Sequence, residues 1–366
     1  MRKICHLTSA HNRYDVRILK KECISLASQG FKVFLVVNDA NSDETIDGVS
    51  IVSTGYVPKN RRERIFLSVK QVLKVALEID AEIYHLHDPE LLQIVKPLTQ
   101  KGKKVIFDAH EDTCEQIMDK EWIPRPLRKT ISWMFRKYQK GIISNCIGVI
   151  TVTPDIEKNL KVMNRNTVIV TNYPILNNTD ETINRNENNY IFFAGGISEQ
   201  WCHDIIVKAV SELDDIVYKI AGPIEDGYLE RLKSLPGWNK VVYLGRIPHE
   251  KVEMEYQSSI AGMAVNHCSQ LKQEGTLGNT KLFEIMAASK PVICTNYRLW
   301  KEIIDKYHCG ICVEWNNTTQ IAEAIMYLVD NAEEARIMGN NGRKAVEEVF
   351  NWKTQEKILV DFYNRI

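Results

Sequence analysis

The stretch GNTKLFEIMAASKPVICT, residues 278–295, reads as a helix followed by a strand. Leu282, Ile285 and Met286 fall on one helical face, which predicts an amphipathic helix packed on a core. Lys281 and Glu284 are three residues apart on a neighbouring face, so their side chains are within reach of each other. Two opposite charges at the start of a buried helix indicate a binding site there.

Short β-branched runs alternate with longer amphipathic segments along the whole chain. The first half contains KICHLT, KVFLVV, IYHLH, KVIFDAH, GVITVT and TVIVTN, and the second half contains YIFFAGG, IVYKIAGP, KVVYLGR, IAGMAVN, PVICTN and GICVEW. This alternation predicts an α/β fold with two Rossmann-like domains, in which ligands bind at the carboxyl ends of parallel strands. We expect the two domains to face each other across a cleft that holds the site.

The expected domain boundaries lie where this alternation of strand-like and helix-like segments stops and restarts. We expect an N-terminal domain over residues 1–176 and a C-terminal domain over residues 190–345. The polar stretch 177–190, NNTDETINRNENNY, has no periodic apolar face and is interpreted as their connection. Residues 346–366 read as a closing helix that we expect to pack back on the N-terminal domain.

Composition narrows the class of protein. The 366 residues are 44% hydrophobic and include 47 basic and 47 acidic side chains, which argues against a protein that coats nucleic acid. We find no secretory signal and no segment long enough to cross a membrane, so we expect a cytoplasmic protein. The nine cysteines are scattered, and the one CxxC motif, at 309–312, is interpreted as buried and structural.

Several dispersed motifs together resemble one family. GNTKLFEIMAASKPVICTN, 278–296, resembles the signature P-x-K-x-x-E-x-M-A-x-G-x-P-V-I of the family-four retaining glycosyltransferases. HNRYDVRILKKECISLASQGFKVFLV, HDPELL, FDAHED, FAGGISE and FNWKTQ resemble other parts of that family in the same order. The resemblance implies the GT-B fold and transfer of a sugar from a nucleotide-sugar donor with retention at the anomeric carbon.

A departing nucleoside diphosphate requires positive charge beside it. The chain has no Asp-x-Asp pair to hold a metal, so we expect no metal and no other cofactor, and instead a helix N-terminus aided by Lys281. By the resemblance, Glu284 accepts hydrogen bonds from the ribose hydroxyls. We expect the donor to contact this whole segment, which comprises Gly275, Thr276, Leu277, Gly278, Asn279, Thr280, Lys281, Leu282 and Glu284.

The expected donor site departs from the family at three positions. Thr276 stands where the family has its first glutamate, and Glu274, two residues away, could substitute for that glutamate only if the loop shifts. Gly196 and Trp201 stand where many relatives have the arginine and lysine that brace the diphosphate. Lys281 is therefore our main candidate for that charge.

Two more loops are expected at the donor. Arg246 is a second candidate for the missing charge, and by the resemblance the loop YLGRIPH holds the nucleobase through backbone groups of Arg246 and Ile247. Gly195 and Gly196, after YIFFA, suit a close approach of backbone to the donor, although a glycine pair alone is weakly specific.

In the N-terminal domain, FDAHED places His110 just beyond a strand end. By the resemblance, His110 contacts the donor sugar or its phosphate, and Glu111 and Asp112 lie near the acceptor. With Lys281 and Glu284, we expect His110 to form the catalytic set.

HLHD, residues 85–88, invites a second interpretation. His85 and His87 share one face of a strand, a spacing that metal sites use, but third and fourth ligands are not evident. We therefore favour an acceptor-side or structural role, and assign His87 and Asp88 to the acceptor. Asp15 and Arg17 fall at the first strand-to-helix junction, where an acceptor or a phosphate could reach them.

RPLRKTISWMFRKYQK, residues 125–140, contains six basic and no acidic residues, interleaved with aromatic and aliphatic ones. Such a helix is typical of peripheral binding to the inner face of an anionic membrane, and KNRRER, 59–64, could extend the surface. A core-packed helix with a solvated basic edge is the equal alternative.

These features favour a hexosyl- or N-acetylhexosaminyltransferase that uses a UDP-sugar, with a GDP-sugar as second choice. The acceptor is expected to be a glycan or a lipid-linked molecule in cell-surface polysaccharide synthesis. A sugar-nucleotide epimerase of related fold and a catalytically inactive nucleotide-sugar-binding scaffold stay open as alternatives. A nucleic-acid partner is not expected, and a dehydrogenase is disfavoured because Gly-x-Gly-x-x-Gly follows neither first strand.

Overall fold

The structure, a computed structural model, describes residues 1–120, 123–176, 189–267 and 273–366. The chain divides into two compact units. Met1–Asn172 and Trp352–Ile366 form the first unit, and Tyr173–Asn351 form the second. Most of the stretch interpreted as a connection, residues 177–188, lies outside the described residues.

The first unit is built on an eight-stranded sheet that is parallel except at one edge. Its strands, in spatial order, are β3 (Glu44–Ile46), β4 (Val49–Ser53), β2 (Lys32–Val37), β1 (Lys3–Leu7), β5 (Ile83–Leu86), β6 (Lys104–Ala109), β7 (Gly148–Thr151) and β8 (Thr167–Ile169). The chain adds strands on one side of β1 and then returns to add β5 on its other side. The first sheet therefore changes direction between β1 and β5, which is where α/β sheets bind ligands.

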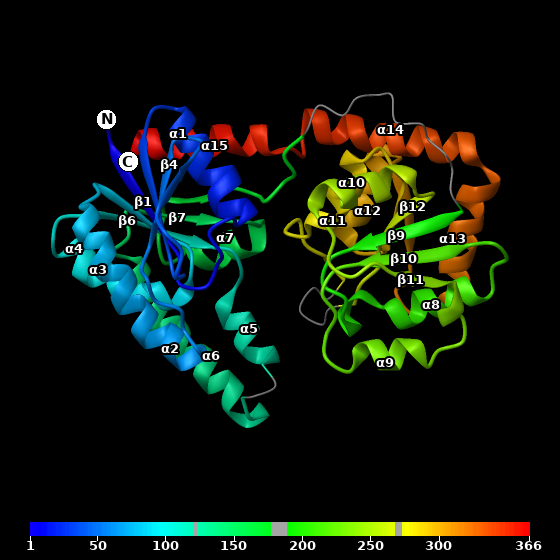
Figure 1. Cartoon of the computed structure of the whole chain (residues 1–366), viewed down its shortest axis with the longest axis horizontal. Coiled ribbons are helices and arrows are strands. Elements are labelled where there is room, and N and C mark those ends of the chain that lie inside the picture. Colours follow the sequence, from blue (N-terminus) through cyan, green and yellow to red (C-terminus); the bar gives the residue numbers. More distant parts are fainter. Residues whose placement is uncertain (121–122, 177–188, 268–272) are drawn as a thin grey trace. The chain divides into compact units, whose positions relative to one another are not determined.

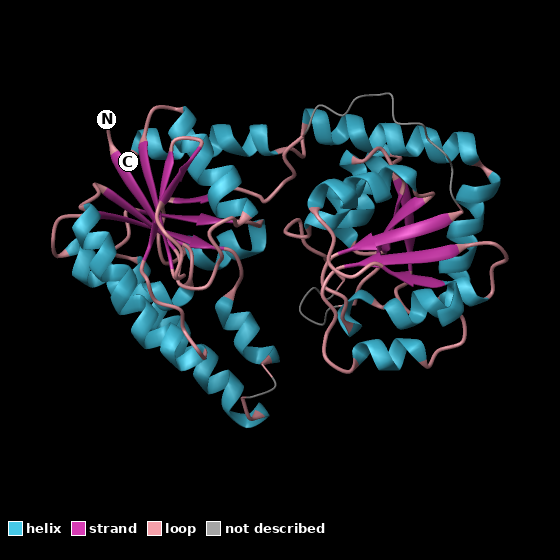
Figure 2. Ribbon diagram, in the orientation of Figure 1, coloured by secondary structure: helices cyan, strands magenta, loops and turns pink. Residues whose placement is uncertain are grey.

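Helices cover both faces of this sheet (Figure 2). In chain order they are η1 (Val16–Cys23), α1 (Ile24–Ser28), α2 (Arg61–Glu63), η2 (Arg64–Ser68), α3 (Val69–Ile79), η3 (Pro89–Ile94), α4 (Val95–Thr99), α5 (Thr113–Asp119), α6 (Arg125–Ile143), α7 (Pro154–Lys161) and α15 (Trp352–Arg365). The segment η1 is a π-helix, whose wider turn changes which side chains share a face.

The second unit is built on a six-stranded, fully parallel sheet. Its strands, in spatial order, are β11 (Val241–Tyr243), β10 (Val217–Ala221), β9 (Tyr190–Ala194), β12 (Ala261–Ala264), β13 (Val292–Thr295) and β14 (Gly310–Val313). Its helices are η4 (Glu199–Trp201), α8 (His203–Ser211), α9 (Tyr228–Lys233), η5 (Trp238–Lys240), α10 (His249–Ser258), α11 (Thr280–Ala287), α12 (Arg298–Tyr307), α13 (Thr318–Asp330) and α14 (Ala332–Glu348). The change of direction falls between β9 and β12.

The stretch at 278–295 forms helix α11 and strand β13, as its pattern predicts. Leu282, Phe283, Ile285 and Met286 of α11 are buried in one core layer of the second unit. Helix α11 lies so close to β12 that a Cβ added to Gly262 would come within 2.4 Å of Ile285. Glycine at this strand position therefore permits the close packing of helix on sheet.

Helix α15, at the end of the chain, packs on the first unit, where it contacts α1 and η1 (Figure 1). Leu359, Phe362 and Tyr363 are fully buried there. The indole nitrogen of Trp352 donates to the hydroxyl of Ser25 at 2.9 Å, so polar contacts fix the start of the helix as well.

Two parallel sheets flanked by helices confirm the predicted α/β class with two Rossmann-like domains. In the described part of the chain, no helix is both long and apolar enough to cross a membrane. Cys309 is buried, and the Sγ atom of Cys312 lies 3.8 Å from that of Cys294.

Replacing Phe362 by alanine should destabilise the first unit, because it removes a fully buried ring from under α15. We expect Phe362→Ala to lower the free energy of unfolding by about 3–5 kcal/mol in urea denaturation followed by fluorescence. The control is Ile358→Ala on the same helix, whose side chain is 37% exposed, and which should cost less than about 1 kcal/mol. Equal effects of the two substitutions would contradict the assigned packing of α15.

Candidate active site

In the second unit, glycines end the strands that meet at the change of direction. Gly195 follows β9 with a φ of +147°, a conformation that side-chain-bearing residues rarely adopt. Its N–H donates to the carbonyl of Ala221 at 2.8 Å, and the N–H of Gly222 donates to the carbonyl of Gly245 at 2.8 Å. Hydrogen bonds thus tie the loops after β9, β10 and β11 into one backbone-rich surface.

Lys281 of α11 lies against this surface. Its ammonium is 4.4 Å from the ring centroid of Trp201 and 5.3 Å from that of Phe193. A Cβ on Gly195 would come within 2.3 Å of the same Nζ atom, so a side chain at this position would displace the ammonium. Burial lowers the pKa of Lys281, an effect that the nearby Glu284 partly opposes. The aromatic rings attract the cation without neutralising it.

Hydrogen bonds fix the conformation of the residues that precede α11 and cap its first turn. The side chain of Asn279 caps the helix by accepting from the N–H of Lys281 at 3.1 Å. The hydroxyl of Thr276 accepts from the N–H of Gly278 at 3.0 Å, and the indole of Trp300 donates to the carbonyl of Thr276 at 2.8 Å. Leu277, Thr280 and Leu282 belong to the same loop and helix, with Leu282 fully buried.

Glu274, the residue offered by the sequence in place of the missing glutamate, has another partner. Its Oε2 atom accepts from Nε of Arg298 at 2.7 Å, and this ion pair is on the surface. Hydrogen bonding to Arg298 lowers the pKa of Glu274. The carboxylate of Glu274 is therefore already engaged by Arg298.

Four other predicted donor residues differ in burial. Glu284 is half-buried one turn after Lys281, and its charge adds to burial in raising the pKa of Tyr256. Arg246 is exposed, whereas Ile247 packs against the core layer that contains α11. Gly196 is open, because a Cβ there would meet nothing within 4 Å.

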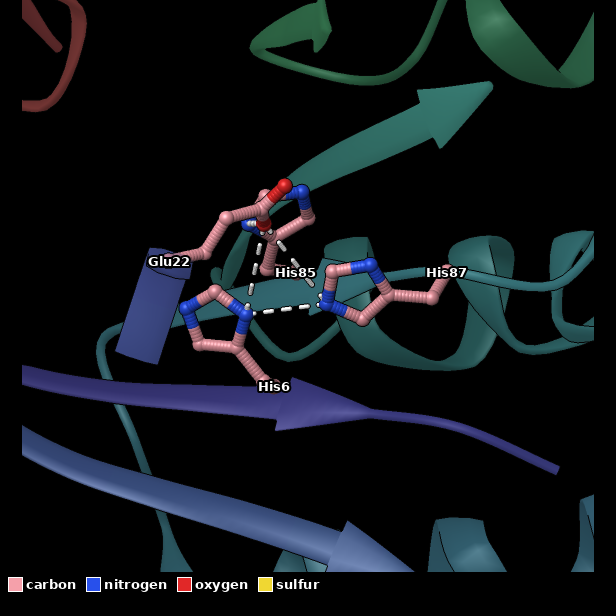
Figure 3. Close-up of side chains that lie close together, drawn as sticks. All are labelled: His6, Glu22, His85 and His87. Atoms are coloured by element: carbon pink, nitrogen blue, oxygen red, sulfur yellow. Dashed lines mark hydrogen bonds and ion pairs between the residues drawn. The ribbon is translucent and has the colours of Figure 1, made fainter. Parts of the chain in front are cut away.

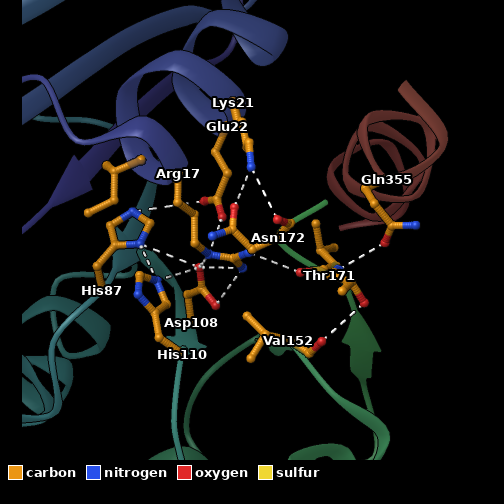
Figure 4. Close-up of polar contacts among 12 residues, drawn as sticks. Arg17, Lys21, Glu22, His87, Asp108, His110, Val152, Thr171, Asn172 and Gln355 are labelled. Carbon is orange, nitrogen blue, oxygen red and sulfur yellow. Dashed lines mark hydrogen bonds and ion pairs between the residues drawn. The ribbon is translucent and has the colours of Figure 1, made fainter. Parts of the chain in front are cut away.

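In the first unit, a network of buried charges lies beneath the carboxyl end of the sheet (Figure 4). Arg17 of η1 is 6% exposed and donates to both oxygens of Asp108 at 3.1–3.3 Å and to the carbonyl of Val170 at 3.0 Å. Glu22 of the same π-helix lies 3.1 Å from Arg17. Although burial opposes it, Arg17 holds the pKa of Asp108 well below its usual range. Burial and the nearby charge of Asp108 raise the pKa of Glu22.

Asp108 also positions two histidines. The Nε2 atom of His110 lies 3.0 Å from Asp108 Oδ2, and Nδ1 of His87 lies 3.4 Å from the same oxygen. The two rings are in contact, with His87 Nδ1 3.3 Å from His110 Nε2. Burial lowers the pKa of His87 to about 4, so its imidazole is neutral near pH 7.

These histidines lie at the base of a cavity of about 800 Å³ within the first unit. Its polar lining includes His87, Asp88, Asp108, His110 and Glu111. Its apolar wall comes from η2, α5 and α6, through Ile65, Phe66, Ile117, Ile131, Phe135 and Tyr138. Arg61, Arg64 and Lys120 line both this cavity and a neighbouring hollow of about 500 Å³. The site thus combines a polar base, an apolar side and a basic rim.

The other predicted acceptor residues do not line this cavity. Asp15 caps η1 by accepting from the N–H groups of Arg17 and Ile18, each at 2.9 Å. Asp112 caps α5 and accepts from the side chain of Asn159 at 2.7 Å. With the buried Arg17, these side chains build the elements around the cavity.

Asp88 lines the cavity and also holds the loop after β1. Its Oδ2 atom accepts from Thr8 Oγ1 at 2.7 Å, from the N–H of Ser9 at 2.6 Å and from the N–H of Ala10 at 3.2 Å. Its Oδ1 atom lies 3.0 Å from Nδ1 of His11. Burial opposes ionisation, but His11 and the loop donors hold the pKa of Asp88 well below its usual value.

Two buried residues beside this cavity, His6 and Glu22, were not predicted from the sequence. His6 of β1 is directly in register with His85 of β5, and both lie beside His87 and Glu22 (Figure 3). The shared strand patterns ICHL and IYHL carry the signal that pairs His6 with His85 once β1 and β5 are taken as neighbours. Burial lowers the pKa of both histidines.

The contacts of Asp88 predict a pH-dependent contribution to stability. Because the folded-state pKa is depressed, the stabilisation is present above the unfolded-state pKa and is lost as the pH falls through the folded value. At pH 7, Asp88→Asn should lower the free energy of unfolding by about 2–3 kcal/mol. The gap from the unmodified chain should persist down to about pH 4 and then narrow.

Urea denaturation across this pH range is the measurement, with Asp80→Asn as control. Asp80 pairs with Lys103 on the surface, so its replacement should leave stability nearly unchanged. A constant gap between the Asp88 variant and the unmodified chain below pH 4 would contradict a charge-dependent role.

Comparison with known proteins gives these sites a context. Residues 177–345 match the sequence model of the glycosyl transferases group 1. Two uncharacterized glycosyltransferases of Methanocaldococcus jannaschii are 27% identical over 169 residues and 29% identical over 228 residues. These matches cover 44% and 60% of this chain, and 41% and 59% of the relatives, so the chain spans about half the length of the curated relatives it matches.

Solved structures resemble the whole chain in fold. Sucrose-phosphate synthase from Thermosynechococcus elongatus has a TM-score of 0.78 at 15% identity, covering 100% of this chain and 99% of its own. HepE of Anabaena, in complex with UDP and glucose, has a TM-score of 0.73 at 11% identity, covering 100% of both chains. WaaG, a glycosyltransferase involved in lipopolysaccharide biosynthesis, has a TM-score of 0.71 at 11% identity, covering 98% of both. Residues 177–345 are therefore similar to the glycosyl transferases group 1, and the chain has the GT-B fold of these solved structures.

Proposed function

We propose that the chain transfers a hexose or N-acetylhexosamine from a nucleotide-sugar to a glycan or lipid-linked acceptor, with retention at the anomeric carbon. The observation that carries this proposal is the half-buried ammonium of Lys281, held by aromatic faces beside the glycine loop at Gly195. A desolvated cation whose surroundings do not neutralise it is suited to an anionic ligand. The diphosphate of a nucleotide-sugar supplies that charge.

The start of α11 offers further groups to a diphosphate. The first N–H groups of a helix lack intrahelical acceptors, and its dipole favours negative charge. Asn279 occupies one of these donors, and Lys281 adds a full charge next to them. This arrangement supports stabilisation of the leaving group by helix amides and a lysine. We propose no metal at the diphosphate.

Glu284 is proposed to bind the ribose hydroxyls of the donor, and the loop at Arg246 and Ile247 its base. HepE of Anabaena was solved with UDP, with UDP-glucose and with UDP and glucose. This likeness of fold supports a UDP-sugar as the first choice of donor, and a GDP-sugar is the second.

The cavity of the first unit is proposed as the acceptor site. Its base offers His110 and Glu111 to a hydroxyl group, its rim offers Arg61, Arg64 and Lys120 to an anion, and its wall is apolar. An acceptor that combines a sugar, a phosphate and a hydrocarbon chain matches all three features. Synthesis of a cell-surface polysaccharide supplies such acceptors, in line with the involvement of WaaG in lipopolysaccharide biosynthesis.

Helix α6 supports attachment to an anionic membrane surface, which we propose as well. Of its 19 residues, Gln139 and Ile143 are buried, which argues against the core-packed alternative. Trp133 is 56% exposed and Met134 59% exposed, and the ammonium of Lys137 lies 4.0 Å from the ring centroid of Trp133. Exposed aromatic and basic side chains on one helix fit the boundary between lipid headgroups and acyl chains. The apolar wall of the cavity comes partly from the same helix.

Replacing Glu284 by alanine tests the donor site. We expect Glu284→Ala to weaken UDP binding, measured by calorimetry, by roughly 10- to 100-fold, because it removes a charged hydrogen-bond acceptor. The control is Glu323→Ala on α13, an exposed glutamate of the same unit, which should bind UDP like the unmodified chain. Unaltered affinity in the Glu284 variant would reject the assignment.

Turnover separates the remaining alternatives. The unmodified chain should release the sugar of a UDP-sugar by hydrolysis or transfer it to an acceptor. A scaffold would bind the UDP-sugar without turnover, and an epimerase would return an isomerised nucleotide-sugar. Proton NMR of fresh product should show the anomeric configuration of the donor, and an inverted product would refute retention.

Removing the exposed side chains of α6 tests the membrane surface. We expect the double variant Trp133→Ala with Met134→Ala to lower the fraction that sediments with phosphatidylserine-containing vesicles by about tenfold or more, because it removes large exposed apolar groups that would enter the bilayer surface. Ile337→Ala on α14, which is 47% exposed, is the matched control. Sedimentation that is the same with neutral and anionic vesicles would exclude the electrostatic part of the proposal.

A further inference from the structure

We propose that His6, Glu22, His85 and His87 bind one divalent transition metal, zinc by the chemistry of the ligands, inside the first unit. The four side chains come from three elements: β1, η1, and the strand β5 with the residue after it (Figure 3). They are brought together by the parallel register of β1 with β5 and by the π-helical turn above them.

Their spacing is that of metal ligands. One nitrogen or oxygen from each residue lies within 4.8 Å of the others. Nδ1 of His6 is 2.9 Å from Nε2 of His87, and Oε2 of Glu22 is 4.0 Å from each of these nitrogens. Oε2 of Glu22 is also 3.8 Å from Nδ1 of His85. Ligands of tetrahedral zinc are roughly 3.3 Å apart, since each lies about 2.0–2.1 Å from the metal.

The hydrogen bonding of these residues is incomplete. Nε2 of His6, Nε2 of His85 and both oxygens of Glu22 are buried, and none has a hydrogen-bond partner among the described residues. Arg17 Nε lies 3.1 Å from Glu22 Oε1, but its hydrogen bond goes to Asp108. Buried polar atoms in folded proteins normally have partners. Among these atoms, Oε2 of Glu22 is the one that faces Nδ1 of His6, Nδ1 of His85 and Nε2 of His87, so its unmatched state calls for a missing ligand at the cluster.

The ligand set selects the class of metal. Three imidazoles and one carboxylate are typical of zinc and of related transition ions, whereas magnesium and calcium prefer oxygen ligands. The four side chains have zero exposed fraction and would fill four positions of the ion. A closed, four-ligand site is typical of structural zinc rather than of a metal that activates substrate.

Contacts around the cluster link it to the cavity. His87 reaches Asp108 through Nδ1 while its Nε2 faces the cluster, and a carboxylate on the far nitrogen orients a metal-bound histidine. Nδ1 of His85 also contacts the Tyr363 hydroxyl at 2.7 Å, so His85 must exchange this partner on binding. The metal would thus fix the His87 ring that lines the acceptor cavity.

A second group, His87 with Asp108 and His110, also has ligand spacing. Asp108 is already engaged by Arg17, whose guanidinium lies 3.1 Å away. This pairing makes the second group the weaker site, and the variants below distinguish the two.

Elemental analysis of the full chain, purified from zinc-sufficient medium and dialysed, should find about one equivalent of zinc. Glu22→Gln and His6→Gln should each reduce the content to about a tenth or less, because each removes a ligand. His110→Gln, in the second group, and His203→Gln, a buried histidine of the second unit bonded to Tyr218, should retain it.

Cobalt substitution keeps the test valid if a variant fails to fold. After removal of metal by a chelator, Co²⁺ added to the unmodified chain should produce the intense visible absorption of four-coordinate cobalt, and Zn²⁺ should raise the melting temperature. Absence of bound metal together with no response to either ion would overturn the proposal. Retention of zinc in the Glu22 and His6 variants, or its loss only in the His110 variant, would overturn it as well.

Discussion

The buried guanidinium of Arg17 is the group around which the first unit is arranged. It joins η1 to β6 through Asp108 and to the end of β8 through the carbonyl of Val170. A charge in this position is tolerated only when paired and hydrogen-bonded, since desolvation otherwise costs several kcal/mol. Removing Arg17 would leave the carboxylates of Asp108 and Glu22 buried without their shared cation, so the carboxyl ends of the strands around the cavity depend on this guanidinium.

In the second unit, the half-buried cation Lys281 has different neighbours. Arg17 lies against carboxylates of its own unit, whereas the ammonium of Lys281 lies over the rings of Trp201 and Phe193. Aromatic faces attract a cation without cancelling its charge. The contrast separates an ion pair that organises the fold from a charge that stays available to a ligand.

Much of the fold could be predicted because it follows from local periodicity. Alternating runs gave the α/β class, and the apolar face of 282–286 gave the packing of α11. The π-helical turn η1 could not be predicted in this way, because a period of 3.6 residues places Arg17 and Glu22 on different faces. The wider turn brings them to the same side, where Glu22 meets the histidines.

The two sites were predictable to different degrees, because contacts between residues close in sequence follow from local periodicity and contacts between distant residues do not. Lys281 and Glu284 are close in sequence, so their proximity needs only a helix. His6 and His85 are 79 positions apart in the chain, and they meet because β5 pairs with β1 in one register. Asp15 and Asp112 were expected at the acceptor from their position after strands, yet their oxygens accept from helix N-termini. A short acidic side chain at such a junction can either bind a ligand or cap the helix, and sequence alone does not separate these two roles.

The departures of the proposed donor site from the motifs that it resembles have a common physical basis. Two exposed cations beside a diphosphate would each act through a high dielectric constant, in which a unit charge pair at 4 Å gains only about 1 kcal/mol. One cation in a partly buried position acts at an effective dielectric nearer 20, where the same pair gains about 4 kcal/mol. Trp201 in place of a charged residue contributes the apolar surroundings that lower the dielectric, and Gly195 leaves the space. A single shielded lysine can therefore replace two exposed charges, provided that the ligand excludes water when it binds.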